Sequence, residues 1–73
     1  MNPPWKQVVG IEVKAAKRWR SGDGAALKRL LDEGHVGCGY GVYLGAEALR
    51  DGPVNVLPLP RFLERLGAGE ILA

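Results

Sequence analysis

The sequence predicts an α/β fold made of a βαβ unit, an additional edge strand and a C-terminal helix. Two apolar runs alternate with a period of two residues, an amphipathic helical stretch lies between them, and a proline opens a second helical stretch near the C-terminus. A strand, a helix and a strand within about 40 residues form a βαβ unit, so the two strands should run parallel. The 73 residues have room for one small domain, with a leader at 1–5 and a loose tail at 68–73.

The first strand is predicted over residues 7–15, where β-branched residues are frequent. Successive side chains of a strand point to opposite faces. One face therefore carries Val9, Ile11, Val13 and Ala15, and the other carries Gly10, Glu12 and Lys14. Hydrophobic alternation explains the first set, but it does not explain two charges in the middle of a strand.

A helix is predicted around residues 26–31, where Ala26, Leu27, Leu30 and Leu31 form one apolar stripe. Ser21 or Asp23 is the expected N-cap. Gly34 suits the left-handed position that follows a helix.

The second strand is predicted over residues 36–44. Its alternation places Val36, Cys38 and Val42 on one face, so Cys38 is expected to be an inert core thiol. The other face carries a track of glycines at 37, 39 and 41, which weakens a strand and needs a reason. Close packing of the preceding helix is one reason, and the approach of a ligand or nucleic-acid backbone is the other.

The last third of the chain is predicted to contain a polar turn, a short strand and a helix. Residues 45–53 form the turn, and residues 54–59 form a third strand that Pro58 limits to an edge position. Pro60 suits the first turn of the final helix. The apolar stripe of this helix consists of Phe62, Leu63 and Leu66.

The composition excludes several classes of protein. One Cys and one His cannot build a disulfide framework or an intrachain zinc site, and no apolar run approaches the roughly 18 residues of a membrane span. The first five residues lack the basic flank and apolar core of a signal peptide, so we expect a cytoplasmic protein. The scarcity of Asn, Gln and Cys fits a thermophile, and a GC-rich genome would produce the same bias.

The net charge of +2 is unevenly distributed along the chain. Residues 14–29 carry +5, whereas residues 30–73 carry −3. The candidate nucleic-acid-binding residues in and beside the basic segment are Lys14, Lys17, Arg18, Trp19, Arg20, Lys28 and Arg29. Cations around an aromatic side chain can grip phosphates and stack on a base, which makes DNA a candidate partner. The plainer interpretation is a solvated loop whose Trp19 packs on the domain.

Four stretches carry a resemblance to a known family. They read Val-Val-Gly-Ile-Glu-Val-Lys-Ala over 8–15, the apolar helical stripe over 26–31, Gly-Val-Tyr-Leu-Gly over 41–45, and Val-Leu-Pro-Leu-Pro over 56–60. This series resembles the C-terminal domain of unknown function of prokaryotic AAA-type ATPases, a member of the PD-(D/E)xK nuclease-like superfamily. The resemblance covers residues 8–66. It implies a partial restriction-endonuclease-like core that lacks the first helix and first strands, and it makes an ATPase domain a candidate partner.

The resemblance also implies roles for two charged residues. In active members, an upstream Asp and the Glu of Glu-x-Lys bind Mg²⁺, and the Lys orients or deprotonates the attacking water. Glu12 and Lys14 match the Glu and the Lys, so they are the candidate catalytic residues and Glu12 the candidate metal ligand. No acidic residue precedes Glu12, and the spacing of Asp23 does not favour it as a substitute. The catalytic site is therefore expected to be incomplete.

Three interpretations of Glu12 and Lys14 stay open: a same-face ion pair, a vestigial nuclease site, and a metal site completed by another chain. The corresponding functions are a non-catalytic relative that acts through self-association or partner contacts, a nucleic-acid-binding accessory protein, and a nuclease active only as an assembly. Only the last would need a cofactor, Mg²⁺. Open sheet edges and apolar surface predict a homo-oligomer, with no membrane partner.

Overall fold

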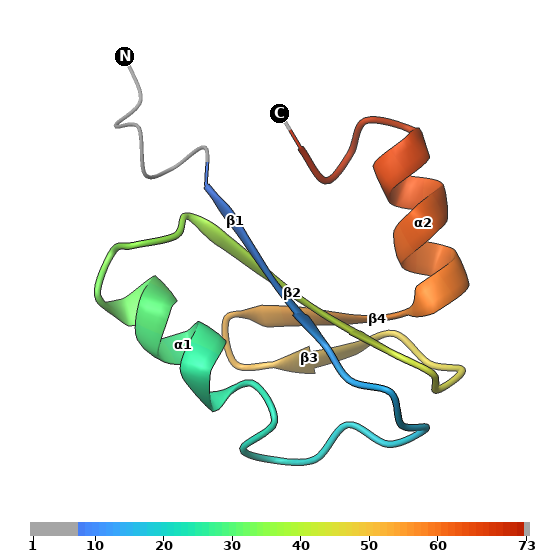
Figure 1. Ribbon diagram of the computed structural model, residues 1–73, viewed down its shortest axis with the longest axis horizontal. Helices are drawn as coiled ribbons and strands as arrows, with labels where there is room; N and C mark the ends of the chain where they lie inside the picture. The colour runs from blue at the N-terminus through green and yellow to red at the C-terminus, as the bar shows by residue number, and fades with distance from the viewer. Residues whose placement is uncertain (1–7, 73) are drawn as a thin grey trace.

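The computed structural model describes residues 8–72. Six elements follow one another along the chain (Figure 1): β1 (Val9–Val13), α1 (Ala25–Asp32), β2 (Cys38–Tyr43), β3 (Leu49–Asp51), β4 (Val54–Pro58) and α2 (Leu59–Gly67). The predicted leader at 1–5, the first residue of the predicted strand and the last residue of the tail lie outside the described residues. The α/β class is confirmed.

The strands form one four-stranded mixed sheet in the order β1-β2-β4-β3. β1 pairs with β2 in parallel, from Val9 opposite Cys38 to Val13 opposite Val42. β2 also pairs with β4 in parallel, and β3 pairs with β4 antiparallel. The parallel βαβ unit predicted from the sequence is therefore confirmed.

The predicted edge position of the third strand is wrong. β4 lies between β2 and β3, and the real edges among the described residues are β1 and β3. The pairing with β3 begins at Val54 and ends at Val56, so Pro58 lies beyond it. The expected turn region at 45–53 holds the missed strand β3, joined to β4 by a tight turn in which Gly52 has a φ of +59°.

The two helices cover opposite faces of the sheet, which lies between them in Figure 1. Neighbouring residues of β2 and β4 alternate between two hydrophobic clusters, as the period of a strand requires. The cluster on the α1 face contains Leu27, Val36, Tyr43, Val54 and Val56. The cluster on the α2 face contains Tyr40, Val42, Leu57, Phe62 and Ile71.

The glycine track is explained by close packing on the α1 face. A Cβ atom on Gly39 would lie 2.9 Å from Leu31 Cδ1 and 3.1 Å from Leu27 Cδ2. The predicted close approach of the helix is therefore confirmed at Gly39. At Gly41 the neighbour is not the helix but the loop before it, because a Cβ atom there would lie 2.5 Å from Trp19 Cη2.

The two ends of α1 differ in how well they agree with the caps predicted from the sequence. The N-cap of α1 is Gly24 without a side-chain cap, so the prediction of Ser21 or Asp23 is wrong. Gly34 has a φ of +80°, as predicted. It donates its N–H to the Leu31 carbonyl while His35 donates to the Leu30 carbonyl, which is the Schellman arrangement.

Three apolar residues depart from the predicted pattern. Val36 joins the α1 face rather than the face of Cys38 and Val42, because it precedes β2 and strand alternation does not apply there. The predicted stripe of α2 is buried only at Phe62, since Leu63 is 54% exposed. In the tail, Ile71 is only 5% exposed and packs in the α2-face cluster, so the loose tail is corrected at that residue.

Candidate anion-binding site

Glu12 of β1 and Lys14, which directly follows β1, lie on the face that α1 covers. Gly10, two residues before Glu12, approaches Leu27 of α1, and alternate residues of a strand share a face. Lys14 forms an ion pair with Asp23, nine residues further along the chain. The ion pair predicted between Glu12 and Lys14 is not formed, because residues 8–72 include no ion pair of Glu12.

Asp23 links the end of β1 to the turn before α1. Its carboxylate accepts hydrogen bonds from the Lys14 ammonium and from the Arg20 backbone N–H. These two contacts, the Lys14 one first, hold the pKa of Asp23 below its ordinary value of 3.8. Asp23 thus stays ionised and fixes the backbone at Arg20.

Asp51 at the end of β3 forms a second such link. Its Oδ1 lies 2.5 Å from Lys28 Nζ of α1, and its Oδ2 accepts a hydrogen bond of 2.9 Å from the Trp19 indole N–H. These two donors, Lys28 first, lower the pKa of Asp51 below 3.8. β3, α1 and the loop between β1 and α1 are therefore joined at one carboxylate.

Trp19 is anchored on the domain and is not available as a free stacking platform. Its ring lies over Gly41 of β2 and beside Gly24. It also meets Tyr43 edge to face, with ring centroids 6.4 Å apart and an interplanar angle of 84°. The plainer prediction for Trp19, packing on the domain, is confirmed.

Three cationic residues flank the anchored tryptophan in the sequence: Lys17, Arg18 and Arg20. We call these three residues the basic loop. All three residues are exposed, and none of them takes part in the ion pairs of residues 8–72. They line two adjoining hollows: Tyr43, Glu47 and Leu49 complete one, and Lys14 and Asp23 complete the other. Glu47 is the one carboxylate in the first hollow, and its backbone carbonyl accepts the Tyr43 hydroxyl.

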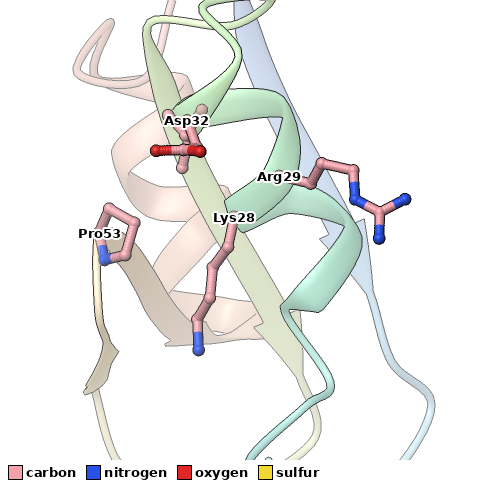
Figure 2. Close-up of a pocket in the computed structure, with 5 residues that line it drawn as sticks. Lys28, Arg29, Asp32 and Pro53 are labelled. Carbon is pink, nitrogen blue, oxygen red and sulfur yellow. The ribbon is translucent and has the colours of Figure 1, made fainter.

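Lys28 and Arg29, the other two predicted nucleic-acid-binding residues, lie on α1, outside the basic loop. Both line a hollow between α1 and Pro53, and the Lys28 ammonium is engaged by Asp51. Figure 2 shows the Arg29 guanidinium on the other side of α1, pointing away from Pro53. The structure therefore joins Lys17, Arg18 and Arg20 into one surface and leaves Lys28 and Arg29 outside it.

The residues around Glu12 do not fit Mg²⁺. This ion usually takes more than one anionic oxygen, and it competes poorly for carboxylates that are already paired. The part of the chain that the structure describes has no cluster of three or more Asp, Glu, His or Cys side chains that would hold a metal. The nearest candidate for the missing carboxylate, Asp23, is already bound by Lys14 and the Arg20 N–H.

Comparisons of the chain with protein-family models, with curated proteins and with solved structures found no match. The nuclease-like ancestry therefore stays a prediction from the four sequence stretches. Among residues 8–72, no helix has the length and apolar character that crossing a bilayer requires.

Sequence reasoning missed the two carboxylates that organise this site. The sequence predicts Asp23 only as an N-cap or a substitute metal ligand, and Asp51 only as part of a turn. Asp51 and Trp19 are 32 residues apart, and no sequence periodicity relates them. The one available signal was the Asp51-Gly52 pair, which is typical of a tight hairpin and places Asp51 at a strand end.

Proposed function

We propose that this chain is a non-catalytic, nuclease-like protein that binds the phosphate backbone of nucleic acid through the basic loop. The observation that carries the proposal is the pairing pattern of the cations. Lys14 and Lys28 are engaged by Asp23 and Asp51, whereas Lys17, Arg18 and Arg20 are exposed and have no ion pair among residues 8–72. Cations without carboxylate partners are free to contact phosphates.

The anchoring of Trp19 supports phosphate binding rather than recognition of a base. A partly buried, hydrogen-bonded indole holds the loop backbone in place, so less conformational entropy is lost when a ligand binds. Two arginines beside it supply planar donors that match phosphate oxygens. Phosphate contacts carry no sequence information, so the expected binding is independent of sequence.

The same geometry argues against nuclease chemistry in one chain. A lysine that activates water has to be free to approach that water. Here the Lys14 ammonium is held by Asp23, and residues 8–72 include no group of three or more Asp, Glu, His or Cys side chains that could hold a metal. Nuclease activity would require another chain to displace Asp23 from Lys14.

Salt dependence tests the proposal. Three phosphate contacts give a slope of log K against log salt of about −2.7 on duplex DNA. Affinity should then fall roughly 40-fold between 50 and 200 mM salt, with a weak Kd of about 10⁻⁴ to 10⁻⁶ M at physiological salt. The measurement is the fluorescence anisotropy of a short labelled duplex titrated with the protein at several salt concentrations.

A pair of variants locates the binding surface. Arg18→Ala with Arg20→Ala should reduce the slope to about −0.9, because one phosphate contact remains. The matched control is Arg50→Ala with Arg61→Ala, which removes the same charge from β3 and from α2 and should keep the full slope. Equal losses in the two variants, or no binding at low salt, would refute the basic loop as the binding surface.

A further inference from the structure

β1 has a free backbone edge. Among residues 8–72 it pairs with β2 alone, on one side. The Lys14 N–H donates to Val42, and the Val8 carbonyl accepts from Gly37, so these even-numbered residues direct their backbone groups toward β2. Adjacent residues of a strand direct their backbone groups to opposite edges. Val9, Ile11 and Val13 therefore present their N–H and C=O groups to the free edge.

The side chains along this edge are apolar and uncovered. Ile11 is 46% exposed and Val13 is 69% exposed on the α2 face, because α2 packs over β4 and β2 rather than over β1. An exposed apolar edge strand is a template for pairing with another strand. Natural edge strands usually avoid such pairing with prolines, bulges or inward-pointing charges. β1 has no proline, and its one charged residue, Glu12, lies on the other face.

We propose that the free edge binds β1 of a second copy of this chain, antiparallel, about a two-fold axis at Ile11. This register places Ile11 opposite Ile11 and Val9 opposite Val13, and these three residues of each copy direct their backbone groups to the shared edge. Gly10 then lies opposite Glu12, so no two charges meet. The pairing uses the whole of β1, Val9–Val13, and nothing outside it.

The registers shifted toward the C-terminal end of β1 are less favourable. An axis at Glu12 would place two Glu12 carboxylates directly opposite each other, and like charges in that position destabilise a sheet. An axis at Val13 would extend the pairing to residues 15 and 17. There the chain has left β1, and the Ala16 N–H turns back to the Lys14 carbonyl. A register shifted by a single residue would place the side chains of the second strand on the opposite face of the sheet, so Ile11 and Val13 would no longer meet apolar partners.

A second copy suits this edge because the contact is self-complementary. A two-fold interface repeats each contact, so Ile11 packs against Ile11 of the second copy and Val13 packs twice against Val9. The positive charge that follows β1 does not oppose the pairing. With the axis at Ile11, the two Lys14 Cα atoms lie roughly 20 Å apart along the strand direction. Charges at that distance are screened, because the Debye length is about 8 Å at physiological salt.

Disulfide trapping tests both the partner and the register, in a Cys38→Ala background that removes the native thiol. In this register the two Ile11 Cα atoms are about 5.5 Å apart, a separation that a disulfide spans. Ile11→Cys should therefore form a covalent dimer under mild oxidation. Val13→Cys is the matched control: its side chain is more exposed, but the two copies lie roughly 13 Å apart along the strand and should not cross-link.

Charge pairing at the axis supplies a test that does not depend on oxidation. Sedimentation velocity should show a concentration-dependent dimer for the native chain. Ile11→Lys and Ile11→Glu should each be monomeric when alone and should form a heterodimer when mixed, because opposite charges then meet across the axis. Circular dichroism confirms that each variant is folded. A native monomer at all concentrations, equal cross-linking of Val13→Cys, or no heterodimer on mixing would each overturn the proposal.

Discussion

The two faces of the sheet are held to their helices by different means. On the α1 face, a helix and a tryptophan pack over glycines, and two carboxylates tie the loop and α1 to the strand ends. On the α2 face, the contact is apolar and aromatic. The rings of Tyr40 and Phe62 meet edge to face with centroids 6.1 Å apart. Burial, and to a smaller extent the hydrogen bond with Cys38, raises the pKa of Tyr40 above its ordinary value of 10.0.

This difference separates stability from positioning. Burial of apolar surface stabilises without fixing a direction, whereas hydrogen bonds and ion pairs fix which atoms meet. Both faces bury an apolar cluster that contributes stability, and on the α2 face this cluster is the main contact. The α1 face contributes the placement of the basic loop, through the contacts of Trp19 and Asp23. Changes on the α2 face should alter the free energy of unfolding, and changes on the α1 face should alter where the basic loop lies.

The largest expected effect is on the α2 face. Phe62 is 7% exposed, so Phe62→Ala should lower the free energy of unfolding by about 3–5 kcal/mol. A chain of 73 residues has roughly 4–11 kcal/mol in total, so the variant will be close to unfolding at room temperature. Leu63→Ala on the same helix, where the side chain is 54% exposed, should cost under about 1 kcal/mol. Urea titrations followed by circular dichroism give both values, and similar losses would contradict the assignment of the core.

A smaller effect is expected on the α1 face. The added methyl group of Gly41→Ala would lie 2.5 Å from Trp19 Cη2, so the indole has to move and its bond to Asp51 is disturbed. Overpacking of this kind costs about 1–3 kcal/mol. The control is Gly67→Ala at the end of α2, where an added Cβ meets nothing within 4 Å.

The readout that separates the two faces is the indole resonance of Trp19 in NMR spectra. It should shift in Gly41→Ala and stay in place in Gly67→Ala. An unchanged resonance together with unchanged stability in Gly41→Ala would show that the loop does not rest on β2.

The smallest effect is a pH dependence that belongs to the α1 face alone. Asp23 and Asp51 have lowered pKa values in the folded protein. A lowered carboxyl pKa adds stability above the ordinary value of 3.8, and that stability is lost as the pH falls through the lowered pKa. Unfolding free energies measured in steps from about pH 6 to pH 2 should therefore decline, beginning below about pH 5.

Asp51→Asn should flatten part of that decline, by under about 1 kcal/mol because the pair is partly exposed to solvent. Asp32→Asn changes an exposed carboxylate that has no ion pair among residues 8–72, and it is the matched control. If both variants follow the native curve, the lowered pKa of Asp51 does not contribute to stability.

Local patterns in the chain were sufficient to predict the larger elements. Period-two alternation located β1 and β2, the apolar stripe located α1, and Pro60 located the start of α2, because these signals act within one element. The predictions failed where contacts between elements decide the outcome. Pro58 was taken to mark an edge strand, but a proline is tolerated in β4 because the pairing with β3 ends at Val56.

The candidate site was only partly predictable for the same reason. The sequence places seven candidate residues at 14–29 but does not say which cations are neutralised. The structure pairs Lys14 with Asp23 and Lys28 with Asp51, and it buries one side of Trp19 against Gly41. These contacts join segments that no local period connects, so the basic loop could be identified only after the chain was folded. Four candidate cations have no ion pair among residues 8–72, and of these only Arg29 lies outside the basic loop, on α1.

The sequence by itself determined the α/β class, the parallel βαβ unit and a basic segment after the first strand, because alternation and charge are properties of neighbouring residues. Only the tertiary structure decided the order of the strands, the free edge of β1 and the residues of the basic loop. The strand order depends on which strands pair, and the basic loop depends on which carboxylate meets which cation. Both are set by packing between distant segments rather than by position in the chain.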